Sequence, residues 1–285
     1  MAITTPTSSY HTTTRGTKLH YLQTGNQTGP LLLCLHGLGG STDTFNPLLP
    51  YLPSDYSTIL VDFPGFGKSP LTASPNTISI ANHVADLDDF ITSLQGPSQP
   101  RGVVIIGHSM GAIVALQYAA LRPETVKGLA LLGAGRSAAG IPAAKQRMLD
   151  LAAAVREKGV AFAADLATKS NFYEPTPERK ADPKAQEAVR NAVLAADPEA
   201  YARTCEALVD PEHKDPKYEL IVAPAVFVAG DKDVISPVER SQGLRESIGG
   251  KSWVEVMKSG HQPILEDIEG VKSAINKLFE SINST

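Results

Sequence analysis

Cysteine is scarce in this chain, with only two among 285 residues. One of them, Cys34, lies in a continuous apolar run and is typical of a buried strand residue. A fold held together by several disulfides is therefore excluded, and a reducing compartment is expected. The first residues show neither the basic region nor the apolar segment of a secretory signal, so we expect a cytoplasmic protein.

Long apolar runs and an excess of positive charge are also missing. No apolar stretch approaches the roughly 20 residues that a membrane-spanning helix needs. Lysine and arginine number 26 against 30 aspartate and glutamate residues, which gives a net charge of −4. Proteins that bind DNA or RNA usually carry a basic surface instead. We therefore expect neither a membrane nor a nucleic acid as a partner.

Apolar segments of strand length alternate with segments of helical periodicity over most of the chain. This alternation is typical of the α/β fold class. The expected strands are 18–22, 31–35, 57–62, 102–106, 126–132, 225–230 and 253–257. The expected helices are 78–94, 111–121, 238–248 and 269–282.

The alternation stops between about residues 138 and 217. This part is rich in alanine, glutamate and lysine, and its apolar residues recur at helical spacing without a convincing strand. We expect a helical insertion that covers the sheet. The predicted division is a core of residues 1–135 and 221–285 with a helical cap, or lid, of residues 136–220.

The segment 107–111 reads Gly-His-Ser-Met-Gly and matches the pattern Gly-x-Ser-x-Gly. An apolar strand precedes it and a helix follows it, which is the setting in which this pattern forms a nucleophile turn. The two glycines leave room where a Cβ would clash. Ser109 also lies at a helix N-terminus, where free N–H groups favour negative charge. We predict that Ser109 is a catalytic nucleophile.

A serine hydroxyl needs a base, and on this kind of sheet the chain order is serine, acid, histidine. Only His213 and His261 follow Ser109. His213 lies among charged residues of the insertion and is expected to be solvated. His261 lies in a loop after the last strand, at the sheet edge where α/β enzymes place their sites. We predict His261 as the catalytic base.

Two aspartates, Asp231 and Asp233, follow the strand 225–230 and are candidates for the acid. We predict Asp233, whose carboxylate would hold the imidazole of the base in its working tautomer. Asp231 is expected to support the turn. Arg136 would either bind a substrate carboxylate or lie solvated at the rim, and the rim is favoured.

The glycine-rich segment 36–40 follows the strand 31–35 and is expected to turn backbone N–H groups into the site. We predict that the N–H groups of Leu38 and Met110 stabilise an oxyanion. The segment lacks the Gly-Lys-Ser/Thr ending and the G-x-G-x-x-G spacing of phosphate-binding loops. The histidines are too scattered for a metal cluster, so neither a cofactor nor a metal is expected.

These motifs, in this order, resemble the α/β-hydrolase superfamily over nearly the whole chain. The matching segments are 36–40, 62–69, 107–111, 230–233 and 260–261. The resemblance implies an eight-stranded, mostly parallel sheet with a helical cap after strand six, and it supports Asp233 and His261. Residues 196–208 look like the cap segment of 3-oxoadipate enol-lactonases and related esterases. Haloalkane dehalogenases and epoxide hydrolases have aspartate at the position of Ser109, so the serine argues against these two branches of the superfamily.

The predicted function is hydrolysis of a small carboxylic ester or lactone through an acyl-enzyme. A C–C bond hydrolase acting on a vinylogous diketone would use the same three residues and stays an alternative. A second alternative is a ligand-binding receptor of low turnover on the same fold. The expected partner is a small-molecule substrate, with the protein a monomer or a homodimer.

Overall fold

The computed structural model describes residues 5–71, 78–95 and 102–284. Residues 1–4, which belong to the segment considered for a secretory signal, lie outside the described residues. The strands are β1 (Thr7–Thr12), β2 (Lys18–Gly25), β3 (Leu31–Leu35), β4 (Ser57–Val61), β5 (Val103–His108), β6 (Val126–Leu132), β7 (Ala225–Gly230) and β8 (Ser252–Met257).

The strands form one sheet in the order β1-β2-β4-β3-β5-β6-β7-β8. β2 runs antiparallel to both of its neighbours, β1 and β4, and the other neighbouring pairs are parallel. This arrangement confirms the predicted α/β class and the eight-stranded, mostly parallel sheet.

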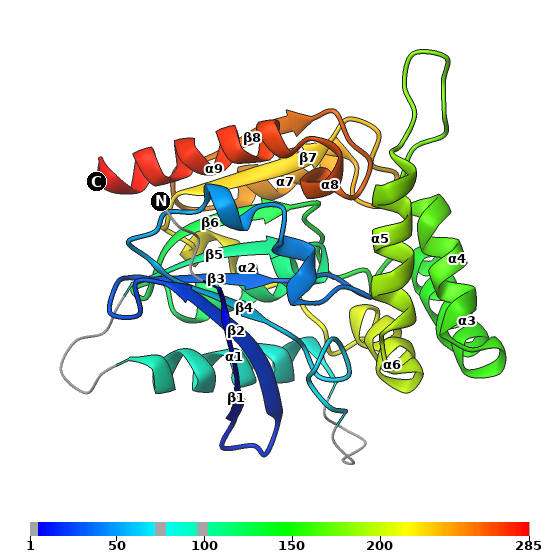
Figure 1. Cartoon of the computed structure of the whole chain (residues 1–285), viewed down its shortest axis with the longest axis horizontal. Helices are drawn as coiled ribbons and strands as arrows, with labels where there is room; N and C mark the ends of the chain where they lie inside the picture. Colours follow the sequence, from blue (N-terminus) through cyan, green and yellow to red (C-terminus); the bar gives the residue numbers. More distant parts are fainter. Residues whose placement is uncertain (1–4, 72–77, 96–101, 285) are drawn as a thin grey trace.

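Helices cover both faces of the sheet and one of its ends (Figure 1). They are α1 (Ile80–Leu94), α2 (Met110–Leu121), α3 (Pro142–Lys158), α4 (Val160–Ser170), α5 (Pro183–Leu194), α6 (Pro198–Leu208), α7 (Val238–Ser247), α8 (Pro263–Glu266) and α9 (Ile268–Asn283), with short 3₁₀ turns at Thr42–Phe45, Leu49–Tyr51 and Tyr218–Leu220. None of the helices in the described part of the chain combines the length and the apolar character needed to cross a bilayer.

The central strands are apolar on both faces because both faces are covered. In β3, Leu31 and Leu33 belong to the cluster that packs against α1, α2 and α7. Leu32 and Cys34 point the other way, into the cluster that packs against α9. The sheet thus holds its strand ends rigidly, and those ends carry the residues of the candidate site.

Helices α3 to α6 follow one another between β6 and β7 and gather at one end of the sheet, at the right of Figure 1. Two of them begin with an Asp-Pro pair, in which the aspartate caps the helix. The side chain of Asp182 accepts the N–H of Lys184, and that of Asp197 accepts the N–H of Ala200. Proline at the first helical position needs no hydrogen-bond acceptor, so these pairs fix where α5 and α6 start.

A buried histidine–aspartate pair, His20 and Asp62, ties the antiparallel edge to the rest of the sheet. Each is 1 % exposed, and His20 Nδ1 lies 2.7 Å from Asp62 Oδ2. The N–H groups of Thr42 and Lys68 donate to the same carboxyl group, at 2.6 and 2.9 Å. Ser8 Oγ lies 2.8 Å from the other ring nitrogen of His20. The network joins β1, β2 and the loop after β4.

Asp62→Asn is expected to lower the free energy of unfolding by about 3–5 kcal/mol, because the amide keeps only one acceptor oxygen and turns an NH₂ donor toward groups that are themselves donors. Urea denaturation followed by circular dichroism measures the change. The matched control is Asp55→Asn at an exposed position, which should stay within about 0.5 kcal/mol of wild type. Equal stability of the two variants would show that the buried network does not stabilise the fold.

Candidate active site

Ser109 occupies the tight turn between β5 and α2. Its φ is 53°, and among the described residues it is the only non-glycine residue with a positive φ. Such a conformation costs on the order of 1–3 kcal/mol and persists only where the surroundings enforce it. The N–H of Ser109 donates to the carbonyl of Leu132 at 2.8 Å, which anchors the turn to β6.

The glycines on either side of Ser109 are required by close backbone contacts. A Cβ on Gly111 would overlap the carbonyl oxygen of Leu35 in β3. A Cβ on Gly107 would lie 2.6 Å from the carbonyl oxygen of Gly111. The pattern Gly-x-Ser-x-Gly is thus what lets the turn sit this close to the neighbouring strand.

The structure brings the three residues predicted for the reaction into one hydrogen-bonded row. Ser109 Oγ lies 2.9 Å from His261 Nε2, and His261 Nδ1 lies 2.7 Å from Asp233 Oδ2. A carboxylate only accepts hydrogen bonds, so Nδ1 of His261 carries the proton. Nε2 is then free to accept the proton of the Ser109 hydroxyl. The segments involved are 152 and 28 residues apart in the chain.

The environment of Asp233 keeps its carboxyl group ionised. Burial would raise the pKa of Asp233, but the hydrogen bond from His261 and the N–H groups of Ser236 and Ile235 outweigh it, so the pKa lies below the ordinary value. Both N–H groups donate to Oδ1 at 2.8 Å and leave Oδ2 for the imidazole. An ionised Asp233 therefore accepts the Nδ1 proton of His261 and fixes the tautomer of this ring.

Gly133, directly after β6, makes room for the imidazole. It has a φ of 55°, and a Cβ built on it would lie 3.0 Å from Cε1 of His261 and 3.5 Å from Asp233 Oδ2. Sequence alone did not place this residue in the site. Its signal, a Gly-Ala-Gly segment where a strand ends, indicates a turn but does not say which side chain will lie against it.

The glycine-rich loop 36–40 adjoins the serine turn. A Cβ on Gly37 would lie 2.9 Å from Cβ of Ser109, so the two backbones approach closely. Leu38 is the next residue of this loop. Met110 is the first residue of α2, where backbone N–H groups have no acceptor within the helix.

His36 holds the glycine-rich loop in place. The N–H of Phe63 donates to Nε2 of His36 at 3.0 Å, so Nδ1 carries the proton and donates to the carbonyl of Gly37 at 2.7 Å. Burial lowers the pKa of His36, which keeps the ring neutral in this role.

Helices α5 and α6 lie against the glycine-rich loop at the end of the sheet. A Cβ on Gly39 would lie 2.7 Å from Val193 Cγ2 and 3.1 Å from Tyr201 Cε2. The N–H of Asp197 donates to the carbonyl of Gly65 at 2.9 Å, which joins the start of α6 to the loop after β4. In the site itself His261 is only 4 % exposed, whereas Ser109 beside it is partly exposed.

Asp231 and Asp233 lie in one turn but have different partners. Asp231 forms an ion pair with Arg179, with Oδ2 2.7 Å from Nη1, and its Oδ1 accepts the N–H of Ser259 at 3.1 Å. It therefore supports the loop that leads to His261 and links it to the helical segment between β6 and β7. The supporting role expected for Asp231 agrees with these contacts.

Two expectations about side chains of the inserted segment need revision. His213 is not solvated: it is 7 % exposed, its Nδ1 lies 3.2 Å from the carbonyl oxygen of Leu208, and burial lowers its pKa. Arg136 does lie at the rim, but paired rather than free, with Nε 2.7 Å from Oδ2 of Asp215. Charged neighbours in sequence did not predict burial because the fold places His213 against the core.

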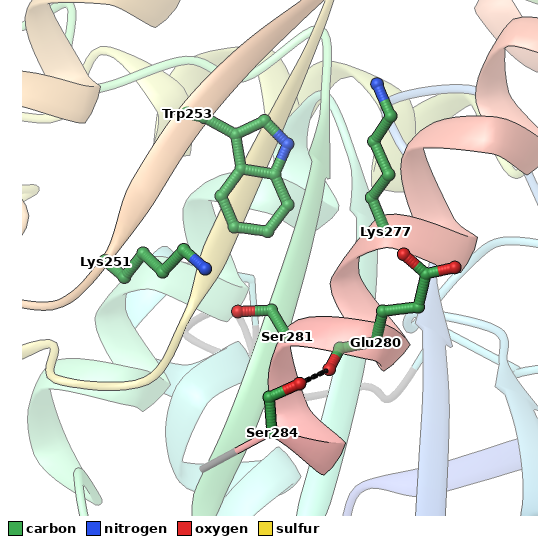
Figure 2. Close-up of a pocket in the computed structure, with 6 residues that line it drawn as sticks. All are labelled: Lys251, Trp253, Lys277, Glu280, Ser281 and Ser284. Atoms are coloured by element: carbon green, nitrogen blue, oxygen red, sulfur yellow. Dashed lines mark hydrogen bonds between the residues drawn. The ribbon is translucent and has the colours of Figure 1, made fainter.

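A shallow surface hollow lies at the opposite end of the sheet, where β8 begins and α9 ends (Figure 2). Its lining is mostly charged or polar and consists of Lys251, Trp253, Lys277, Glu280, Ser281 and Ser284. These residues lie far along the strands from the serine turn. In the described part of the chain no group of three or more His, Cys, Asp or Glu side chains is arranged to hold a metal ion.

A mostly parallel sheet with a serine on a strained strand-to-helix turn, followed by an aspartate and a histidine after later strands, defines an α/β hydrolase. Residues 32–272, most of the chain, match the alpha/beta hydrolase family. The chain belongs to this family.

Individual relatives cover nearly the whole chain. The pimeloyl-[acyl-carrier protein] methyl ester esterase of Neisseria meningitidis is 29 % identical over 256 residues, with 87 % of this chain and 93 % of that protein covered. A thermophilic esterase from Thermogutta terrifontis superposes with a TM-score of 0.82 at 25 % identity, over 97 % of this chain and 99 % of that one.

The enol-lactonase from Burkholderia xenovorans LB400 superposes with a TM-score of 0.78 over 95 % of this chain and 100 % of that one. At 20 % identity it shows a shared fold alone. Family and relatives together support an enzyme of the α/β-hydrolase class, similar in sequence to esterases.

Proposed function

We propose that the protein hydrolyses a small carboxylic ester or lactone, with Ser109 as nucleophile, His261 as base and Asp233 as the acid that orients the base. The observation that carries this proposal is the row of two hydrogen bonds, 2.9 and 2.7 Å long, that joins the three side chains. Nucleophile and base lie within hydrogen-bond reach, and a third group orients the base, as acyl transfer requires.

In the first half of the reaction, Ser109 Oγ attacks the carbonyl carbon of the substrate while its proton moves to Nε2 of His261. The carbonyl oxygen becomes an anion, and the N–H groups of Leu38 and Met110 are the proposed donors that stabilise it. As the tetrahedral intermediate collapses, the bond to the leaving oxygen breaks and His261 returns the proton to that oxygen. The product is an alcohol and an acyl group on Ser109.

In the second half, a water molecule gives a proton to His261 and its oxygen attacks the acyl carbon. Collapse of the second intermediate breaks the bond to Ser109 Oγ, which recovers its proton from His261. The carboxylic acid leaves, and the enzyme is restored. For a lactone, acid and alcohol are the two ends of one opened molecule.

We further propose that residues 136–220 act as the cap over the substrate. Val193 and Tyr201 lie against the glycine-rich loop and present apolar and aromatic surface beside the proposed oxyanion site. Such a lining favours a small, largely apolar group over a charged one. The similarity to a methyl ester esterase adds short methyl esters to the candidate substrates.

The test is labelling with a fluorophosphonate, followed by peptide mass spectrometry and a panel of substrates. The panel contains p-nitrophenyl esters of increasing acyl length, methyl esters and five- and six-membered lactones. We expect one covalent adduct, on the peptide that holds Ser109, and turnover of at least one ester or lactone class. Protein unfolded in urea is the control and should not react. Absence of both labelling and turnover would overturn the proposal.

A further inference from the structure

His108, the last residue of β5, contacts the main chain of His261. Its Nε2 lies 2.8 Å from the backbone carbonyl oxygen of His261, and the two rings are 5.2 Å apart between centroids. A carbonyl oxygen only accepts, so Nε2 of His108 carries a proton and donates. The contact joins residues 153 positions apart in the chain.

The ring of His108 is placed to donate this bond without adding charge. It is 5 % exposed, and burial together with the nearby His261 lowers its pKa to about 4. A second imidazolium beside His261 would oppose protonation of the proposed base. A neutral donor supplies the hydrogen bond and avoids that repulsion.

The loop that carries His261 is held on successive backbone groups. The N–H of Ser259 donates to Asp231, and the N–H of Gly260 donates to Glu266 at 2.9 Å. The N–H of His261 donates to the carbonyl of Asn171, just after α4, at 2.7 Å. These three contacts fix the backbone N–H groups of the loop.

The contact from His108 differs from the others because His108 precedes Ser109 directly. The end of β5 is buried and pairs with strands on both sides. It therefore leads directly into Ser109 and also carries His108, whose ring holds the carbonyl of His261. The end of β5 thus helps to position both Ser109 Oγ and His261 Nε2, which lie 2.9 Å apart.

Resting on the proposed function, we infer that His108 is a positioning residue, which holds the backbone of His261 so that its imidazole stays within hydrogen-bond reach of Ser109. It does not touch the substrate and takes no proton in the cycle. Its effect is on the rate of the proton transfer, and hence on kcat, rather than on substrate binding.

The test compares His108→Gln with His108→Met. The amide nitrogen of glutamine sits at about the reach of Nε2 and can donate to the same carbonyl, whereas methionine has similar length and no donor. We expect kcat to fall about 100-fold in the methionine variant with KM unchanged, as a misplacement of about 1 Å can cause. The glutamine variant should recover most of that loss. The rate of fluorophosphonate labelling should fall most in the methionine variant and less in the glutamine variant.

Equal activity of both variants and wild type would overturn the inference, and so would equal losses in both. Nitrogen-15 spectra of the wild-type histidine rings give a second test that needs no folded variant. At pH 7 His108 should be neutral with its proton on Nε2, and a proton on Nδ1 would contradict the inference. A wild-type protein that neither labels nor turns over any substrate would instead contradict the proposed function.

Discussion

Ser109→Ala is expected to lower kcat by about six orders of magnitude on whichever ester or lactone the wild type hydrolyses. Alanine removes the hydroxyl oxygen that lies 2.9 Å from His261 Nε2, and no acyl-enzyme can form without it. The residual rate should come from binding and from the backbone N–H groups alone. Fluorophosphonate labelling should disappear together with turnover, because both report the same nucleophile.

The matched control is Ser273→Ala, which removes a hydroxyl from an exposed position on α9. It should label and turn over like wild type. Alanine at position 109 keeps the strained backbone that glycine would relieve, so thermal unfolding of the variant must be checked beside activity. A folded Ser109→Ala protein that still labels and turns over at the wild-type rate would remove the serine from the mechanism.

The nucleophile turn could be predicted from sequence because everything that forms it lies within a few residues. The strand, the two glycines and the following helix are adjacent in the chain, and each has a strong local pattern. The strands β3, β5 and β7 could be predicted as well, because burial on both faces leaves almost no polar position in them. Chain order then pointed to His261 and to one of the two aspartates after β7.

The first strand was missed for the opposite reason. β1 lies at the sheet edge, and its residues Thr7–Thr12 are polar except for a half-exposed tyrosine. Its pairing with β2 and its side-chain contacts, such as Ser8 with His20, stabilise it rather than an apolar pattern. A short stretch of sequence around β1 does not show which residues will pair with it, so the strand could not be predicted.

The supporting residues around His261 were missed because they are contributed by distant segments. Gly133, His108 and Asn171 come from the ends of β6, β5 and α4, and they meet the histidine loop only in the folded chain. Their residue types are ordinary for turns and strand ends. Long-range packing decides which of many such residues contact the site, and a single sequence does not encode it locally.

The same limit applies to the two aspartates of the turn after β7. From sequence they are two positions apart in one polar loop. In the structure the backbone directs Asp233 inward, where it is 4 % exposed, and leaves the side chain of Asp231 35 % exposed beside Arg179. Their buried and exposed settings explain why one carboxylate can orient an imidazole while the other ties two loops together.

Asp233→Asn is expected to lower kcat by about 10⁴-fold, while Asp231→Asn should leave it within about tenfold of wild type. In the first variant the amide can donate to Nδ1 of His261, which would place the imidazole proton on Nε2, where it cannot accept from Ser109. The second variant would lose only a partly exposed ion pair with Arg179, and such pairs contribute about 1 kcal/mol or less. Steady-state kinetics of both variants, with circular dichroism to show that they fold, measures the difference. A larger loss from the substitution of Asp231 than from that of Asp233 would mean that the orienting carboxylate had been assigned to the wrong member of the turn.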